Sequence, residues 1–155
     1  MNWLRSLCLT GILAAGLVPL SSAEAGSYSY RQYYSGWQQA PYRSYYYRTY
    51  YYKPTPTYVG YKYHYVIYYP SRPQYVYYYN PYRGTYWGRY PTATCEKGQY
   101  SMLAEEDRKA RLEDIPEKAF PKPGAMPRVP EAEDNIKVDA PPDDLPTREN
   151  LPKNG

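Results

Sequence analysis

Residues 58–90 read YVGYKYHYVIYYPSRPQYVYYYNPYRGTYWGRY, and the first part of this stretch alternates between two kinds of side chain. Aromatic and β-branched residues at a period of two are typical of an extended strand with two different faces. One face of a strand over 61–69 would carry Tyr61, Tyr63, Tyr65, Ile67 and Tyr69, and the other Lys62, His64, Val66 and Tyr68. The pattern therefore predicts a first strand over 61–69.

Two further strands are predicted on either side of a turn. Residues 80–84 read NPYRG, in which asparagine can bond its own backbone, proline fixes φ, and glycine permits a positive φ. The flanking segments 74–79 and 85–90 are again rich in aromatic residues. We expect a three-stranded antiparallel meander, whose packed face would consist of tyrosine rings.

Residues 26–57 are predicted to be a tyrosine-rich, low-complexity segment that is either disordered or loosely extended. The triplets 45–47 and 50–52 place rings on both faces of any strand, so neither face is specified. Leu, Ile, Val and Phe make up only about a tenth of the chain after residue 25, which is typical of disordered chains.

Downstream, Ser101 is expected to cap an α-helix that begins at Met102 and ends before Pro116. Two i,i+4 pairs would support it, Glu105 with Lys109 and Asp107 with Arg111. Residues 121–155 hold eight prolines among charges and are predicted to be a disordered tail, or an extended one of polyproline type. The expected fold class is thus a mostly disordered, low-complexity chain with a small β-rich segment and one short α-helix, ordered only within 58–120.

The N-terminus has the pattern of an export signal. A short basic region precedes the apolar run 7–20, and Ala23-Glu24-Ala25 forms a cleavage site, which predicts a signal peptide over 1–25. The alternative is an uncleaved anchor, but a spanning helix requires about 20 apolar residues. We expect export to the periplasm, the cell surface or the exterior, with no membrane span after cleavage near Ala25.

Charge divides the chain into two parts. Residues 26–94 carry basic side chains and no acid, whereas acids outnumber bases in 95–155. The two parts would attract each other, or each would attract a different partner. Cys95 is alone after signal cleavage, so it is either a free thiol or a link between chains.

The sequence supports no catalytic, cofactor-binding or metal-binding residue. His64 and Cys95 could form a nucleophilic pair, but nothing else in the sequence supports one. No group of histidines and cysteines has metal-ligand spacing, and no glycine-rich phosphate loop is present. Asp143 and Asp144 are interpreted as solvating charges. We expect a protein that is not an enzyme and has no cofactor.

Three segments carry a family resemblance: YYNPYRGTYWGR at 78–89, YSMLAEEDRK at 100–109 and DIPEKAFPKPGAMP at 114–127. With PPDDLP at 141–146, they resemble uncharacterised exported tyrosine-rich bacterial proteins. The resemblance implies an exported bacterial protein with a variable aromatic front. It transfers no activity and no site residue.

Three functions are compatible with interleaved tyrosine and arginine. The first is a cohesive or structural component of the cell surface or envelope, which self-associates through many weak Tyr–Arg contacts. The second is a binding module for an anionic or carbohydrate envelope polymer, or for extracellular nucleic acid. Nucleic acid is the less expected ligand, because the chain is exported and its basic residues are sparse. The third is a segment with no specific partner.

Overall fold

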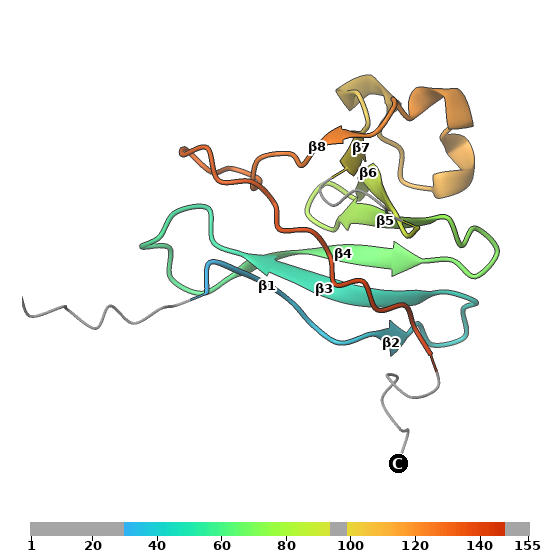
Figure 1. The fold of residues 1–155 in the computed structure, drawn as a ribbon, viewed down its shortest axis with the longest axis horizontal. Coiled ribbons are helices and arrows are strands. Elements are labelled where there is room, and N and C mark those ends of the chain that lie inside the picture. The colour runs from blue at the N-terminus through green and yellow to red at the C-terminus, as the bar shows by residue number, and fades with distance from the viewer. Residues whose placement is uncertain (1–29, 94–98, 148–155) are drawn as a thin grey trace, which may run out of the picture.

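The computed structural model describes residues 30–93 and 99–147, which form one antiparallel sheet of eight strands with three single 3-10 turns (Figure 1). The strands are β1 (Gln32–Tyr34), β2 (Gln38–Gln39), β3 (Tyr46–Tyr52), β4 (Lys62–Tyr68), β5 (Tyr75–Asn80), β6 (Thr85–Pro91), β7 (Gln99–Met102) and β8 (Gly124–Ala125). The turns are η1 (Glu105–Asp107), η2 (Leu112–Asp114) and η3 (Glu117–Ala119). The sheet order is β1-β3-β4-β5-β6-β7-β8, and β2 also pairs with β3.

The expected meander is present as β4, β5 and β6. Strand β4 has two different faces, as the alternation predicts. His64 and Val66 point to one side of the sheet, and Tyr65 and Ile67 point to the other. The turn at 80–84 also forms, because Gly84 has a φ of +67° and the Asn80 side chain accepts two backbone N–H bonds.

The prediction of a mostly disordered chain is wrong. Strands β1, β2 and β3 lie within 26–57, and the segment 126–145 runs across the sheet (Figure 1). The tyrosine triplets appear undirected in sequence because rings lie on both faces of β3, one face packed in the core and the other partly exposed. Tyr50 and Tyr52 face one layer of the core, and Tyr47 faces the other.

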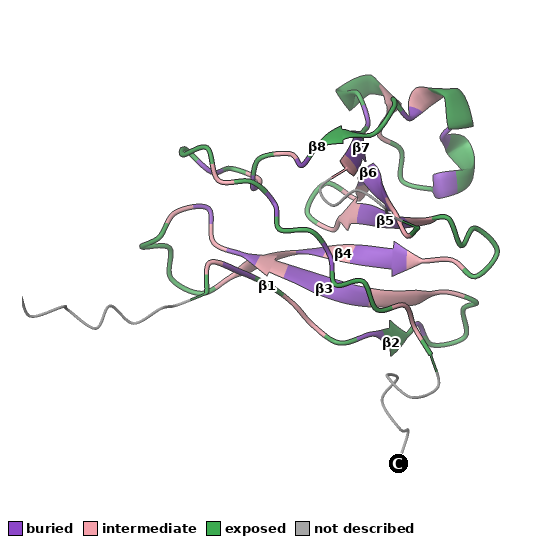
Figure 2. Ribbon diagram, in the orientation of Figure 1, coloured by how far each residue is buried: buried purple, intermediate pink, exposed green. Residues whose placement is uncertain are grey.

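Tyrosine replaces aliphatic residues in the inner layer of the core. Tyr50, Tyr52 and Tyr78 are fully buried, and Met126, Val129 and Val138 from the C-terminal segment pack against this layer. Figure 2 shows buried stretches along the central strands of the sheet. Buried hydroxyls need hydrogen-bond partners. Tyr34 and Tyr78 join their hydroxyls at 2.9 Å, and Tyr50 donates to Gln32. These bonds allow a core with few aliphatic side chains to form.

The part of the predicted tail that the structure describes, residues 121–147, belongs to this layer. Val129 and Val138 are each 2% exposed, and two backbone bonds bring residues 127–129 and 136–138 together. Regular pairing in this proline-rich segment is limited to the two-residue strand β8 and a bridge between Arg128 and Lys137, but an extended chain can still pack against a sheet. The expectation of a disordered tail is therefore wrong for residues 121–147.

The predicted α-helix does not form either. Ser101 lies in β7 and donates to Pro121 O at 2.6 Å, and residues 105–119 form η1, η2 and η3. Leu103 N donates to Trp87 O at 3.0 Å, so the chain continues to pair with the sheet where a helix was expected. Separate turns allow apolar side chains at irregular spacing to reach the outer layer of the core. These side chains are Leu103, Leu112, Ile115 and Phe120.

Basic side chains from the first part of the chain form ion pairs with acidic side chains from the second part. The pairs across the blocks are Arg31–Asp134, Arg48–Asp144, Lys62–Glu131, Arg83–Glu105 and Arg89–Glu117. Glu105 therefore pairs with Arg83 and not with Lys109 as expected. Arg111 likewise pairs with Asp114 instead of Asp107. The interpretation of Asp144 as a solvating charge is also wrong.

Three expectations concern residues outside those described. The signal peptide over 1–25, the disorder of 26–29 and the state of Cys95 all lie there. Among the described helical segments, none has the length and apolar character of a membrane span.

Candidate functional site

Tyrosines from β1, β3, β4 and β5 form rows on the outer side of the sheet. The strand register places Tyr33, Tyr51 and Tyr63 opposite one another, and it also aligns Tyr65 with Tyr79. We call the partly exposed members of these rows the tyrosine face: Tyr33, Tyr45, Tyr47, Tyr51, Tyr63, Tyr65, Tyr69 and Tyr79. Tyr47, Tyr65 and Tyr79 pack at the margin of the core cluster that includes Leu103, Leu112, Ile115 and Phe120, and they stay partly exposed.

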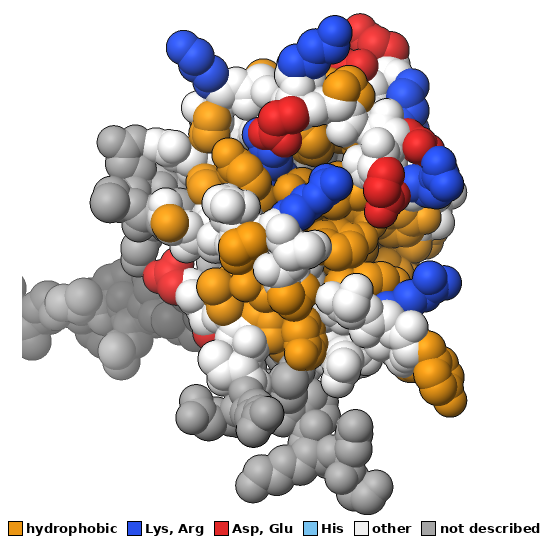
Figure 3. All heavy atoms as spheres, turned by 90° about the vertical axis from the view of Figure 1, so that its right-hand side faces the viewer, with side chains coloured by type: hydrophobic (Ala, Val, Ile, Leu, Met, Phe, Trp, Pro, Cys, Tyr) orange, Lys and Arg blue, Asp and Glu red, His pale blue; other side chains and the backbone are white. Residues whose placement is uncertain are grey.

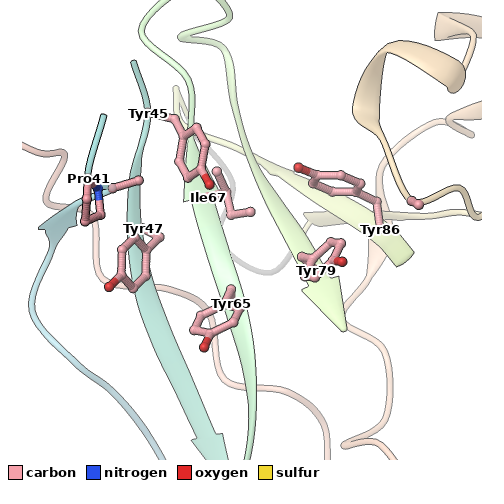
Figure 4. A pocket seen from close by; sticks show the side chains of 9 residues that line it. Pro41, Tyr45, Tyr47, Tyr65, Ile67, Tyr79 and Tyr86 are labelled. Carbon is pink, nitrogen blue, oxygen red and sulfur yellow. The ribbon is translucent and has the colours of Figure 1, made fainter. Parts of the chain in front are cut away.

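A groove of ≈ 420 Å³ crosses the tyrosine face (Figure 4). Tyr47 and Tyr65 come from β3 and β4, Tyr79 and Tyr86 from β5 and β6, and Ile67 lies between them. The remaining lining residues are Ala40, Pro41, Tyr45 and Ala110. The groove is therefore lined by five tyrosines and four apolar residues, without a charged side chain.

Contacts between rings hold the groove in shape. Tyr47 meets Tyr65 edge-on at a centroid distance of 5.6 Å, and Tyr79 meets Tyr86 at 5.1 Å. The hydroxyl of Tyr47 donates to Gln38 Oε1 at 2.8 Å, and those of Tyr69 and Tyr86 lie 2.6 Å apart. Side chains already fixed in this way lose little rotational freedom when a ligand binds.

Two hydroxyls of the groove, those of Tyr65 and Tyr86, are kept neutral at physiological pH by a raised pKa. Burial, followed by the nearby Tyr63, raises the pKa of Tyr65 above its usual value. Burial also raises the pKa of Tyr69, and burial with the hydrogen bond to Tyr69 raises the pKa of Tyr86. Each hydroxyl can then both donate and accept a hydrogen bond.

Most basic side chains of the tyrosine-rich stretch are engaged within the molecule. Arg48 lies 4.4 Å from the centre of the Trp37 ring, and Arg89 lies 3.8 Å from that of Tyr75. Both arginines are buried and ion-paired. Figure 3 shows one side of the molecule, where a band of hydrophobic side chains lies below most of the charged ones. The cation–π contacts of these two arginines thus lie within one chain.

His64 is buried between Tyr52 and Trp87, with ring centroids 5.2 Å from each. Burial, together with the charge of Lys62, lowers the pKa of His64 to about 3, so the imidazole is neutral. Its expected partner Cys95 lies outside the described residues. Within 30–93 and 99–147, no three histidines, cysteines or acids gather in a metal-binding group.

Sequence reasoning missed half of the groove. Tyr65, Ile67, Tyr79 and Tyr86 fall on the predicted strands, whereas Pro41, Tyr45 and Tyr47 come from the segment expected to be disordered. The alternation of Tyr47, Thr49 and Tyr51 with inward residues was the signal available. This alternation was obscured by the inward-facing tyrosines of the same strand, Tyr46, Tyr50 and Tyr52.

No family model, no curated protein and no solved structure matches this chain. The expected relationship to exported tyrosine-rich bacterial proteins stays a prediction. Functional reasoning therefore rests on the groove and on the charges around it.

Proposed function

We propose that this protein is an exported, non-enzymatic binding module that holds a carbohydrate polymer of the cell envelope on its tyrosine face. The observation that carries this proposal is the groove of ≈ 420 Å³, lined by five tyrosines and no charged side chain. Because the groove is open along the sheet surface, an extended polymer is a better match than a compact ligand.

Sugar rings suit such a surface for two physical reasons. Their C–H faces are apolar and pack on aromatic rings, while their hydroxyls bond to polar groups at the ring edge. Tyrosine supplies both, because its ring is apolar and its hydroxyl is a donor and an acceptor. Tyr47, Tyr65 and Tyr79 offer three such groups on successive strands. Each ring contact contributes roughly 0.5–1.5 kcal/mol, so several are needed for useful affinity.

The charge distribution favours a neutral polymer over an anionic one. Nucleic acids and acidic polymers require basic side chains beside the stacking rings. Arg48 and Arg89, each within three residues of a groove tyrosine, are buried in ion pairs, and the exposed Arg43 does not line the groove. A neutral glycan needs no such partner.

Cohesion between copies is the second candidate. Tyr30 is 77% exposed, Tyr42 is fully exposed and Tyr82 is 57% exposed, and none of the three lines the groove. Arg43 is exposed next to Tyr42. These residues could join copies through ring and cation–π contacts, worth about 0.5–1 kcal/mol each at exposed sites.

Affinity electrophoresis tests the proposal. The full chain should migrate more slowly in a native gel that contains hydroxyethyl cellulose, a neutral glucan. The substitutions Tyr47→Ala and Tyr65→Ala should each weaken binding about fivefold, which corresponds to roughly 1 kcal/mol. Tyr42→Ala is the matched control, because it removes a fully exposed ring that does not line the groove and should leave the migration unchanged.

Two results would contradict carbohydrate binding at this face. One is unchanged migration of the wild-type chain in gels with hydroxyethyl cellulose. The other is equal weakening by Tyr42→Ala and Tyr65→Ala. Retardation only by polygalacturonate, an acidic polymer, would favour an anionic ligand. Concentration-dependent sedimentation that is abolished by Tyr30→Ser and Tyr42→Ser would favour cohesion.

A further inference from the structure

A second cavity, of ≈ 520 Å³, lies on the inner side of the sheet. His64, Asn80 and Trp87 line it from β4, β5 and β6, and residues 127–132 close it from the C-terminal segment. Arg83, Arg108 and Arg128 also line it. It shares no lining residue with the tyrosine groove. It is therefore a separate site with a different, basic character.

Two buried polar side chains of this cavity lack a partner at one ring nitrogen. Trp87 Nε1 and His64 Nδ1 have no hydrogen bond within the described part of the chain, and their residues are 6% and 2% exposed. An unsatisfied buried donor or acceptor costs about 1–3 kcal/mol, so native proteins usually provide a partner. The indole N–H of Trp87 can only donate, so its missing partner is an acceptor such as an oxygen atom.

The guanidinium groups of Arg108 and Arg128 are held by the chain while keeping donors available. Arg108 donates through Nε and Nη2 to Leu103 O at 3.3 and 3.2 Å, and Arg128 donates through Nη2 to Ala132 O at 3.2 Å. These bonds occupy Nε and Nη2 of Arg108, and Nη2 alone of Arg128. A guanidinium has five N–H donors, so each retains others for a ligand.

The acids near the cavity are already paired with other cations. Glu131 lines the cavity and pairs with Lys62, and Glu105 pairs with Arg83. Over residues 30–93 and 99–147, no ion pair involves Arg108 or Arg128. Two positive charges at this cavity therefore remain without a carboxylate.

We propose that this cavity binds a small oxyanion, either a carboxylate or a phosphate group, which Arg108 and Arg128 hold by charge and Trp87 by its indole N–H. Arginine suits such a ligand, because its planar donors match the oxygens of carboxylate and phosphate. The neutral imidazole of His64 adds a donor or acceptor without adding charge. The anion would be a free metabolite or an acidic group on a polymer.

The indole N–H resonance of Trp87 provides a direct test. In a ¹⁵N-labelled full chain, inorganic phosphate and D-glucuronate are titrated separately at constant ionic strength, with glucose as the neutral probe. Saturable shifts of the Trp87 signal with phosphate or glucuronate, and none with glucose, are expected. Stronger binding of phosphate would indicate a free phosphate ligand, and stronger binding of glucuronate an acidic sugar.

Two variants and one control test the role of the charges. Arg108→Gln and Arg128→Gln should each weaken binding of the better probe about tenfold, as is typical when one charged hydrogen bond is lost. Arg128 is exposed, so its variant should fold even if Arg108→Gln does not. Arg43→Gln makes the same charge change at an exposed position away from the cavity and should leave binding unchanged. Equal weakening by Arg43→Gln and Arg128→Gln, or no saturable shift with either anion, would overturn the proposal.

Discussion

Arg48 and Asp144 lie 96 residues apart in the chain and form an ion pair of 2.8 Å. The arginine side chain is only 3% exposed, and its guanidinium also stacks on Trp37, whose indole donates to Asp144 O at 3.0 Å. Asp144 thus fixes the end of the C-terminal segment to the inner side of the sheet. The pair links the basic and acidic parts of the chain within one fold.

Replacing Asp144 should destabilise the protein. Asp144→Asn removes the charge that compensates a buried guanidinium, and we expect the free energy of unfolding to fall by about 1–3 kcal/mol. Urea unfolding followed by circular dichroism measures this change. Asp143→Asn is the control, because the neighbouring carboxylate is exposed and should be replaceable within about 0.5 kcal/mol. Equal stability of the two variants would show that the ion pair contributes nothing.

Gly88 should not tolerate a side chain. A Cβ atom at this position would lie 2.1 Å from the Tyr100 hydroxyl and 2.4 Å from two carbons of its ring. Tyr100 is 2% exposed and packs among other rings, so it cannot move away without loss of contacts. We expect Gly88→Ala to lower the melting temperature, with a cost of about 1–3 kcal/mol. Gly36→Ala, which meets no atom within 4 Å, should leave it close to the wild-type value.

Stability should fall as the solution is acidified from about pH 6.5. His64 has its pKa lowered to about 3 in the folded protein, against a usual value of 6.5. Between these values the unfolded chain binds a proton that the folded chain does not, so acid favours unfolding. Urea midpoints measured from pH 7 to pH 4 should decrease. His64→Phe should flatten this slope, and an unchanged slope would argue against a buried neutral imidazole.

Alkali should unfold the protein cooperatively. Burial raises the pKa of Tyr50, Tyr52 and Tyr78 above the usual value of 10. Their contribution to stability is complete below pH 10 and is lost above it, because the unfolded chain releases phenolic protons that the folded chain retains. Phenolate absorbance and the sheet signal in circular dichroism should change together above pH 10. Gradual ionisation with the sheet intact would contradict a tyrosine core.

The meander was predictable because its signals are local. Alternation in 61–69 and the turn at 80–84 depend on neighbours in sequence, and β4, β5 and β6 formed as expected. The tyrosine triplets of β3 were misread because the segment that covers their inward rings, Met126 to Val138, lies far away in the sequence. Pairing between distant segments leaves no periodic signal in either of them.

The error over residues 102–115 has a related cause. Local pairs such as Glu105 with Lys109 favoured an α-helix, at a few tenths of a kcal/mol each. Contacts with the sheet stabilise the observed conformation more than these local pairs would stabilise a helix. Tyr86 N donates to Lys109 O at 3.0 Å, and Glu105 pairs with Arg83. Tertiary contacts therefore outweighed helix propensity, and the groove depended on tyrosines contributed by four separate strands.

Chemical footprinting tests the central claim, that a polymer lies along the tyrosine groove. Acetylation of tyrosine hydroxyls by N-acetylimidazole is measured by mass spectrometry with and without hydroxyethyl cellulose. Tyr47, Tyr65 and Tyr79 should become several-fold less reactive when the polymer is bound, whereas the fully exposed Tyr42 should keep its reactivity. Unchanged labelling of the groove, or equal protection of Tyr42, would contradict the account.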